Sequence, residues 1–387
     1  MTGKERLLAA LAGDNCGRVP FVPNIWQWFY VNRQRGTLPD VLHACRGPVD
    51  ALRVLGAEVM SKFDGLVLRQ QFRACRETVR FEGQPLPEGP LWTSFVEFSG
   101  GTIRRERIDT PCGPLTHVWQ YAPEAGAPFE AEHWWKDFDA EYPAVRAWLE
   151  DAQWRLDRGA LQAGLANVGD DGLLLLQLLP TPLKKFHWLA GPEATSFFIA
   201  DHGDEMQALA AIHEAHCLAV LEEVVGLDGV WAFEVPDNLD SLFYSPALFR
   251  RFCLPVLQKS ARMIHARGKY LFIHACGRLK ALAPLILEAE LDCVEGQAHP
   301  PLGDWRLDEA RALSPRLIVC GGMTAREQEW SGPETSTRID RHVRQIMASL
   351  GDRRRFLFGS GCNTSPNTPW ENLLAFRDAA HRYGEVP

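Results

Sequence analysis

The chain has 387 residues, enough for a large buried core, and 41 lysines and arginines against 49 acidic residues give a formal net charge of −8. With no run of basic residues, this balance gives no sign of a nucleic-acid or membrane partner. No stretch approaches the roughly 18–20 apolar residues of a membrane span, and the first 15 residues resemble a short amphipathic helix rather than a signal peptide. We therefore expect a cytoplasmic protein. The ten cysteines show no framework of spacings, so disulfides are not expected.

Short apolar runs recur along the chain, and each ends in polar or glycine-rich residues. The runs cover residues 19–26, 57–65, 172–180, 229–238, 269–277, 291–297, 316–323 and 354–362. Near-continuous apolar runs of this length are typical of parallel strands that are covered on both faces. Helical patterns lie between the later runs; one begins with Ser245 as N-cap and Pro246 at the first helical position and continues to Gly268. Eight strands alternating with helices predict a single (β/α)8 TIM-barrel domain over residues 1–387.

Residues 67–150 have a different character from the rest of the chain. Segments such as ETVRFEG and GTIRRERIDTPCGPLTHVWQYA alternate polar and apolar residues and are separated by glycine turns. This pattern predicts antiparallel hairpins inserted between the second and third barrel strands. Insertions in the loops that follow barrel strands lie over the catalytic face, so we expect a lid or a substrate-shaping element.

The triplet His-Ala-Cys occurs twice, at His43–Cys45 and at His274–Cys276. In a strand, residues two apart point to the same side, and the second triplet ends the fifth run just before a glycine. Its two side chains can therefore converge at the carboxyl-terminal mouth of the barrel, where barrel active sites lie. The first triplet lies in a segment with a helical pattern, where residues two apart diverge by about 200°. We expect the first copy to be structural.

A zinc ion needs three or four ligands, and further candidates lie at the ends of other strands. Glu295 lies near the end of the sixth run, and Cys362 ends the eighth. With His274 and Cys276 they place an imidazole, two thiols and a carboxylate on one rim, and these are groups that zinc prefers. Glu295 would be a replaceable fourth ligand. Cys293 and Cys320 also lie near strand ends, but we expect them to be packing residues.

Other polar and aromatic residues also lie near predicted strand ends. Glu234, Asp237 and Asn238 follow the fourth run and are candidates for substrate binding or proton handling, with helix capping and surface solvation as the alternative. Trp26, Trp28 and Tyr30 lie at the exit of the first strand, and Gln297 ends the sixth run. Aromatic walls suit a ring-bearing methyl donor or a corrin face, although for any single tryptophan packing in the core is the favoured explanation.

Three stretches of the chain resemble the uroporphyrinogen decarboxylase superfamily: residues 4–23, 245–268 and 356–376. The resemblance implies a (β/α)8 barrel and two branches of chemistry. In decarboxylases a histidine follows the last strand, where this chain has Cys362. The H-x-C motif followed by a distant cysteine is similar to that of zinc methyltransferases such as the methylcobalamin:coenzyme M methyltransferases. His274, Cys276 and Cys362 match that pattern position by position.

The methyltransferase resemblance implies a bound Zn²⁺ and transfer of a methyl group between a corrinoid (cobalamin) and a small thiol. With a methyl ether or amine instead, the reaction would be a demethylation. No corrinoid-binding motif is evident in the chain, so the corrinoid is expected on a partner protein. The alternative implied by the superfamily is a metal-free decarboxylase of a cyclic or aromatic acid, in which Asp64 and the Arg33/Arg35 segment would act. A zinc-bearing binding protein is a third possibility.

Overall fold

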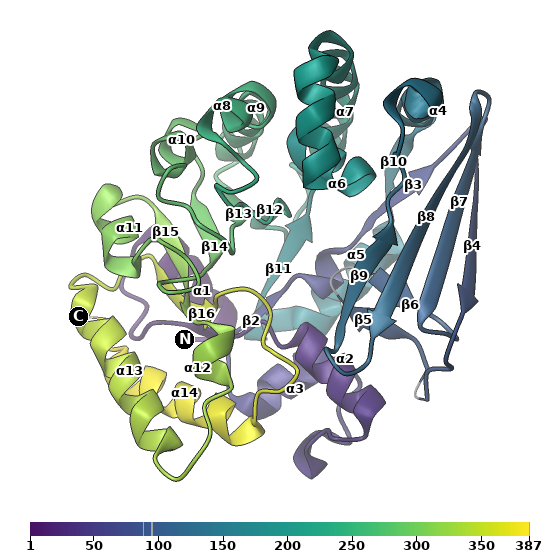
Figure 1. The fold of residues 1–387 in the computed structure, drawn as a ribbon. Helices are drawn as coiled ribbons and strands as arrows, with labels where there is room; N and C mark the ends of the chain where they lie inside the picture. Colours follow the sequence, from purple (N-terminus) through teal and green to yellow (C-terminus); the bar gives the residue numbers. More distant parts are fainter. Residues whose placement is uncertain (88, 94–95, 387) are drawn as a thin grey trace.

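Eight parallel strands form the centre of this computed structural model, which describes residues 1–87, 89–93 and 96–386 (Figure 1). The strands are β1 Phe21–Val22, β2 Val59–Ser61, β11 Gly172–Gln177, β12 Ala232–Val235, β13 Tyr270–His274, β14 Cys293–Gln297, β15 Ile318–Met323 and β16 Phe356–Ser360. They pair in the order β1-β16-β15-β14-β13-β12-β11-β2. A hydrogen bond of 3.0 Å from Glu58 N to Phe21 O links the two edges. The sheet is thus a nearly closed barrel, and all eight predicted strands are confirmed.

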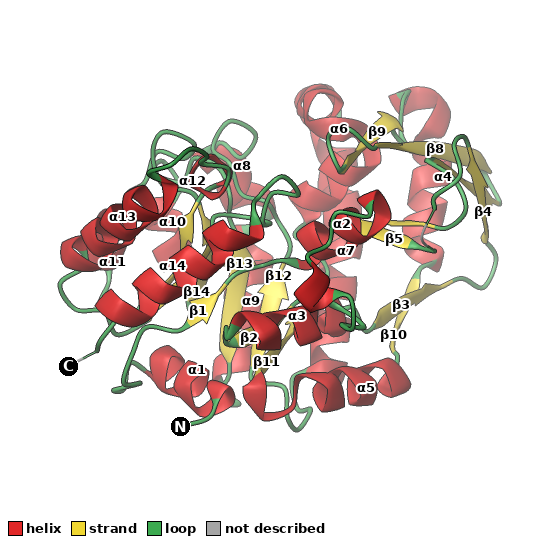
Figure 2. Cartoon of the chain, turned by 90° about the horizontal axis from the view of Figure 1, so that it is seen from below, coloured by secondary structure: helices red, strands yellow, loops and turns green. Residues whose placement is uncertain are grey.

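Helices alternate with these strands and surround the barrel (Figure 2). They are α1 Gly3–Ala12, α2 Trp26–Arg35, α3 Pro48–Leu55, α5 Arg158–Val168, α6 Pro182–Asp201, α7 Gly203–Val224, α8 Pro246–Phe252, α9 Leu254–His265, α10 Ala283–Glu288, α11 Leu307–Leu313, α12 Ala325–Gln328, α13 Thr335–Ser349 and α14 Trp370–Tyr383. The predicted N-cap is confirmed, because the Ser245 side chain accepts a hydrogen bond from Leu248 N. Within the described residues, none of the helices is both long and apolar enough for a membrane crossing.

The helical segment that follows Ser245 is broken where the sequence predicts one continuous helix. It divides at Cys253 into α8 and α9. Pro255 lies in the first turn of α9, where its missing N–H needs no partner. The same missing N–H would interrupt a continuous helix, which explains the break.

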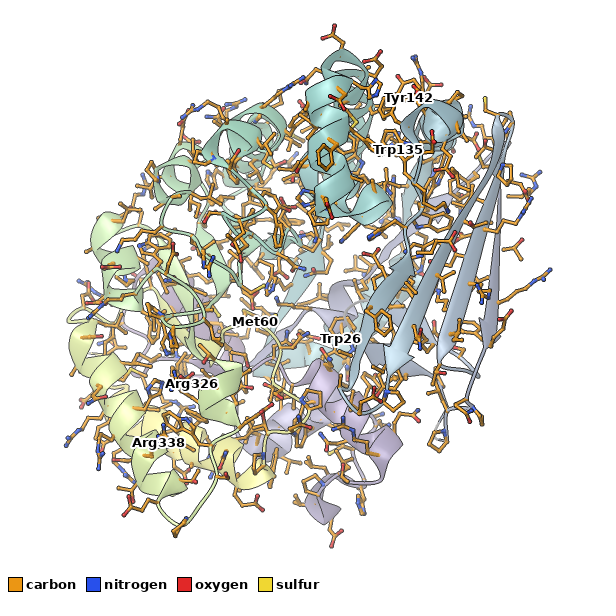
Figure 3. The ribbon with its side chains drawn as sticks, viewed as in Figure 1. Trp26, Met60, Trp135, Tyr142, Arg326 and Arg338 are labelled. Atoms are coloured by element: carbon orange, nitrogen blue, oxygen red, sulfur yellow. The ribbon has the colours of Figure 1, made fainter. Side chains whose placement is uncertain are left out.

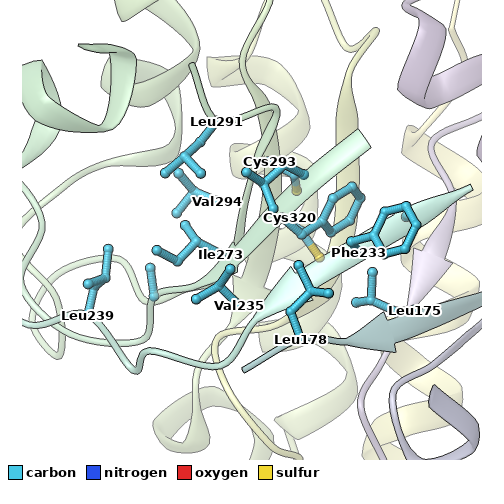
Figure 4. Close-up of a cluster of buried hydrophobic side chains, with 14 of the residues drawn as sticks. Leu175, Leu178, Phe233, Val235, Leu239, Ile273, Leu291, Cys293, Val294 and Cys320 are labelled. Carbon is cyan, nitrogen blue, oxygen red and sulfur yellow. The ribbon is translucent and has the colours of Figure 1, made fainter. Parts of the chain in front are cut away.

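Apolar side chains from neighbouring strands are buried together in the core of the domain (Figure 4). Every residue of β11, β14, β15 and β16 is buried. Cys293 and Cys320 lie in this core beside Phe233 and Leu175. Both cysteines are 1 % exposed or less, so their predicted packing role is confirmed.

The chain between β2 and β11 forms the predicted β-rich insertion, which stands to one side of the barrel in Figure 1. Its elements are β3 Leu68–Gln71, β4 Arg76–Glu82, β5 Leu91–Thr93, β6 Val96–Phe98, β7 Ile103–Thr110, β8 Gly113–Ala122, β9 Ala127–Glu132, α4 Phe138–Asp151 and β10 Gln153–Leu156. Strands β4-β7-β8-β9 make an antiparallel sheet, and β10 returns along β3. A small apolar cluster, which includes Val31 of α2 and Phe98 and Tyr121 of the insertion, joins the insertion to the barrel.

The first His-Ala-Cys triplet does not lie in a helix, so that part of the prediction is wrong. A 3-10 turn covers Asp40–Leu42, and α3 begins only at Pro48. His43 is exposed, and its Nε2 lies 2.9 Å from the carbonyl oxygen of Leu38, whereas Cys45 is buried. The two side chains therefore lie in different surroundings, and the expected structural role of this copy fits the fold.

Candidate metal centre

Three potential zinc ligands converge at the carboxyl-terminal rim of the barrel. His274 is the last residue of β13, Cys276 follows it by two residues, and Cys362 lies two residues beyond β16. One donor atom from each lies within 4.8 Å of the other two. The Sγ atom of Cys362 is 3.6 Å from Nε2 of His274. The imidazole is buried and both thiols are half-buried, so this rim could hold one ion with a side open to substrate.

The other ring nitrogen of His274 faces a buried network of charged residues. Nδ1 lies 2.5 Å from Oε2 of Glu295 and 3.2 Å from Nζ of Lys62. Lys62 donates to Glu295 and, over 2.8 Å, to Oε1 of Glu234. Gln177 donates to the second oxygen of Glu234 over 2.6 Å. Glu295 therefore contacts the nitrogen that faces away from Cys362, and it forms a separate possible ligand group with Glu234 and His274.

Burial and charge pairing act against each other in this network. Burial and the charge of Lys62 lower the pKa of His274, but Glu295 and Cys362 outweigh them and raise it to about 9. Burial raises the pKa of Glu234 to about 7, although Lys62 counteracts the effect. Burial also acts to raise the pKa of Glu295, but Lys62 and His274 overcome it and hold that pKa well below its usual value. The geometry thus favours an ionised Glu295 that accepts a hydrogen bond from Nδ1–H of His274.

The two thiols of the cluster influence each other in opposite directions. The hydrogen bond between them raises the pKa of Cys276 and lowers that of Cys362. Burial raises both, and His274 helps to lower the pKa of Cys362. Cys362 is therefore the thiol that ionises first, with Cys276 as its hydrogen-bond donor. A thiolate beside an imidazole is the form that binds a metal ion.

A glycine in β14 allows the His274 ring to occupy its position. Gly296 has φ of +79° and lies at an irregularity in the pairing of β14 with β15. A Cβ atom at this position would lie 2.6 Å from Cε1 and 2.9 Å from Nδ1 of His274. Only glycine combines this backbone conformation with so close an approach.

Substituting Gly296→Ala is expected to displace the imidazole and to weaken metal binding by about 10–100-fold, the range seen when groups that orient ligands are lost. Competition with a chelator measures this affinity. Gly47→Ala is the control, because nothing lies within 4 Å of a Cβ at that position and its φ of −163° suits any residue. An unchanged affinity in Gly296→Ala would contradict this view of the site.

Two carboxylates with a predicted catalytic role, Asp237 and Asp64, accept hydrogen bonds from residues of neighbouring helices. Asp237 is fully buried and accepts hydrogen bonds from the backbone N (2.8 Å) and hydroxyl (2.5 Å) of Thr181, the N-cap of α6. Burial raises the pKa of Asp237 to about 6. Asp64 lies after β2, where one oxygen contacts Ser61 Oγ (2.5 Å) and the other accepts from Asn167 of α5 (3.1 Å). The structure gives both carboxylates positions that anchor helices, whereas Glu234 belongs to the network beside His274.

The predicted aromatic wall divides into core and rim residues. Trp28 is 1 % exposed, stacks on Trp370 and donates to Thr368 O over 2.8 Å, which is a packing role. Trp26 and Tyr30 lie on α2, and both contact the ring of Phe63. Trp26 is labelled in Figure 3, where α2 lies between the barrel and the insertion. Substrate binding by Trp26 and Tyr30 stays a prediction.

The two predicted polar substrate residues also differ in exposure. Asn238 is exposed and has φ of +51°. Gln297 is fully buried, and its amide nitrogen donates to Trp305 O over 3.1 Å. Its amide oxygen is buried without a hydrogen-bond partner among the described residues. An unsatisfied buried acceptor is rare in a folded protein, so Gln297 is suited to accept a hydrogen bond from a bound molecule or water.

Sequence reasoning missed two lysines near the cluster. Lys62 lies within the second apolar run, directly after β2, and a lysine inside that run was the only available signal. Lys184 lies in the first turn of α6. The charges of Asp237, Cys276 and Glu130 of the insertion act to raise its pKa. Burial nevertheless lowers the pKa of Lys184. The charges that act on Lys184 thus come from both the barrel rim and the insertion.

The two arginines of the decarboxylase alternative hold loops in place. The Arg33 guanidinium donates to the carbonyl oxygens of Cys45 and, over 3.3 Å, of Arg46. Arg35 donates to Asn367 Oδ1 over 3.1 Å and to two carbonyl oxygens of the insertion. Both side chains belong to α2 rather than to a loop. These contacts occupy the groups that would bind substrate carboxylates.

The fold and the rim cluster together define an α/β barrel with an imidazole and two thiols at its catalytic end. The family described as uroporphyrinogen decarboxylase (URO-D) matches residues 189–383, half of the chain, including all three residues of the cluster. The chain belongs to the uroporphyrinogen decarboxylase family.

Two solved structures are similar to this chain at low sequence identity, and the first of them shares its fold. A methyltransferase from Methanosarcina mazei is 14 % identical, with 99 % of each chain covered and a TM-score of 0.62. A D-psicose 3-epimerase from Clostridium cellulolyticum H10 is 10 % identical over 58 % of this chain and 83 % of its own, with a TM-score of 0.36. No curated protein matches the chain.

Proposed function

We propose that this protein is a zinc-dependent methyltransferase that moves a methyl group between a corrinoid on a partner protein and a small thiol, methyl ether or amine. The observation that carries the proposal is the convergence of His274, Cys276 and Cys362 within 4.8 Å at the catalytic end of the barrel. The fold shared with the Methanosarcina mazei methyltransferase is consistent with it.

The spacing and chemistry of the three residues fit zinc. Zinc bonds of about 2.3 Å to sulfur and about 2.0–2.1 Å to nitrogen, at a tetrahedral angle, separate the two ligands by about 3.5 Å. The observed distance from Cys362 Sγ to His274 Nε2 is 3.6 Å. One imidazole and two thiolates form a catalytic zinc set that leaves the fourth position for substrate.

The protein groups around the cluster prepare the ligands. A zinc ion bound there would lower the pKa of a substrate thiol, or polarise the heteroatom of a methyl ether or amine. Glu295 accepts a hydrogen bond from His274 and so fixes Nδ1 as the protonated nitrogen. The lone pair of Nε2, on the side of the thiols, is then free to bind zinc. Lys62 pairs with both Glu295 and Glu234, so that its positive charge offsets part of the negative charge buried beside the imidazole. Lys184 is placed to contact an anionic group of the substrate.

Glu295 therefore acts on His274 in this proposal, in place of the direct coordination suggested by its position at a strand end. Glu295→Gln keeps the shape but removes the charge that orients the imidazole, so zinc affinity should fall by about 10–100-fold while the stoichiometry at saturating zinc stays at one ion in this cluster. Chelator competition and metal analysis measure the two quantities. An unaltered zinc affinity in Glu295→Gln would contradict the role of Glu295 in positioning His274.

The function is tested by incubating the zinc-loaded protein with methylcobalamin and a panel of thiols, and with cob(I)alamin and methoxyarenes or methylamines. The absorbance of the corrinoid reports loss or gain of the methyl group. The proposal expects transfer to or from at least one class of substrate, lost in Cys276→Ala. Zinc binding without any methyl exchange would favour a binding protein, and release of CO₂ from a cyclic acid by metal-free protein would favour a decarboxylase.

A further inference from the structure

A second group of metal-ligating side chains lies on the rim, separate from the His274 cluster. His299 lies in the loop after β14, Glu327 in α12 and His342 in α13. One donor atom from each lies within 4.8 Å of the other two. Glu327 is 4 % exposed and both histidines are half-buried. The loop after β14 and the helices α12 and α13 thus bring two imidazoles and a carboxylate together.

The contacts within this group are spaced for a shared ion rather than for hydrogen bonds. Nε2 of His299 lies 3.7 Å from Oε1 of Glu327, which is too long for a hydrogen bond. Two ligands bonded at about 2.0–2.1 Å to a tetrahedral zinc ion are about 3.3 Å apart, so a small movement would suffice. Nδ1 of His299, the other ring nitrogen, is buried with no hydrogen-bond partner in the described part of the chain. No hydrogen bond among those residues therefore fixes the tautomer of this ring, and Nε2 can carry the free lone pair that an ion needs.

Hydrogen bonds to surrounding residues leave one nitrogen of His342 and one oxygen of Glu327 free to bind an ion. His342 Nε2 lies 3.2 Å from the carbonyl oxygen of Gly322, to which it can only donate, so its Nδ1 keeps a free lone pair. Oε2 of Glu327 accepts from the backbone N (2.9 Å) and hydroxyl of Thr324 at the start of α12, which leaves Oε1 free. Such second partners orient metal ligands in known sites. The capping contact explains one oxygen of Glu327 but neither histidine.

We propose that His299, Glu327 and His342 bind a second divalent cation, with Zn²⁺ as the ion that two imidazoles and a carboxylate suit best. Its role would be to brace the rim. Glu327 lies just after β15, and the carbonyl oxygen of Met323 at the end of that strand accepts a 2.6 Å hydrogen bond from Gly361, the residue before Cys362. An ion on Glu327 would therefore stiffen the loop that carries a ligand of the first cluster.

The test counts zinc per chain by mass spectrometry after dialysis against micromolar Zn²⁺. The wild type should bind two ions, Cys276→Ala/Cys362→Ala one, and the same variant with His342→Ala none. Zinc should also raise the melting temperature of the double variant but not of the triple variant. His265→Ala, which removes a half-exposed histidine paired with Asp292, is the control and should leave the count unchanged.

Single His342→Ala in the otherwise intact chain covers the case in which the cysteine variants do not fold. It should lose one ion, and Co²⁺ bound to the remaining site should keep its thiolate-to-metal charge-transfer band. An unchanged zinc count in His342→Ala would overturn the second site. If instead the wild type binds a single ion that His342→Ala removes and the cysteine variants retain, the second site stands and the proposed function fails.

Discussion

Replacing Cys362 with serine is expected to lower the affinity of the rim cluster for zinc by at least a factor of about 100 and to abolish methyl transfer. Cys362 is one of three ligands, and even losing a group that merely orients a ligand weakens metal binding by roughly 10–100-fold. Its thiol lies 3.6 Å from His274 Nε2, and a serine hydroxyl is not ionised at neutral pH. Zinc titration against a chromophoric chelator and the methylcobalamin assay give the two readouts.

The matched control is Cys320→Ala, which changes a cysteine on the neighbouring strand β15. Cys320 is 1 % exposed and lies in the apolar core, so its loss should reduce the free energy of unfolding and leave zinc binding intact. Equal zinc loss in both variants would show that the effect reflects damage to the barrel. Full zinc affinity in Cys362→Ser would remove this residue from the site.

Lys62→Met is expected to reduce the free energy of unfolding by about 3–5 kcal/mol, the range for removing one partner of a buried ion pair. Lys62 is the cation between Glu234 and Glu295, and all three side chains are buried. Without it two carboxylates remain in a medium that solvates charge poorly. Urea unfolding followed by circular dichroism measures the change.

The loss of unfolding free energy caused by Lys62→Met should increase with pH. In the wild type the pKa of Glu295 is held below its usual value, so its stabilising contribution is present above the usual pKa of a glutamate and is lost at lower pH. In the variant the buried carboxylates have raised pKa values, so folding takes up protons and becomes less favourable as pH rises. The difference between the two proteins should therefore be larger at pH 8 than at pH 5.

A second substitution tests whether charge is the cause. Lys62→Met/Glu234→Gln removes one of the two carboxylate charges and should recover part of the lost stability. Lys280→Met, which breaks a solvent-exposed pair with Glu309, should change stability little. A pH-independent deficit with no recovery in the double variant would indicate lost packing rather than unpaired charge.

The barrel could be predicted from the sequence because its signal is local. A parallel strand covered on both faces must be apolar along its length, as in residues 172–177 and 356–360. The ligands could be predicted for a similar reason. His274 and Cys276 are two residues apart at a strand end, and Cys362 follows another strand of the same barrel.

The network behind the ligands depends on contacts between residues far apart in the chain. Lys62 pairs with Glu234 and Glu295, which lie 172 and 233 residues away in the sequence. No local sequence pattern indicates these contacts. The placement of Glu295 on Nδ1 of His274 depends on the strand irregularity at Gly296. Likewise, Asp237 accepts a hydrogen bond from Thr181, the N-cap of α6, although the two residues lie far apart in the sequence.

X-ray absorption at the zinc edge tests the central claim most directly. With the second group silenced by His342→Ala, one zinc ion per chain should show two sulfur ligands at about 2.3 Å and one imidazole nitrogen at about 2.0–2.1 Å. Cys362→Ser should reduce the sulfur count from two to one. A shell of nitrogen and oxygen alone, or a sulfur count that the substitution leaves unchanged, would contradict the proposed zinc centre.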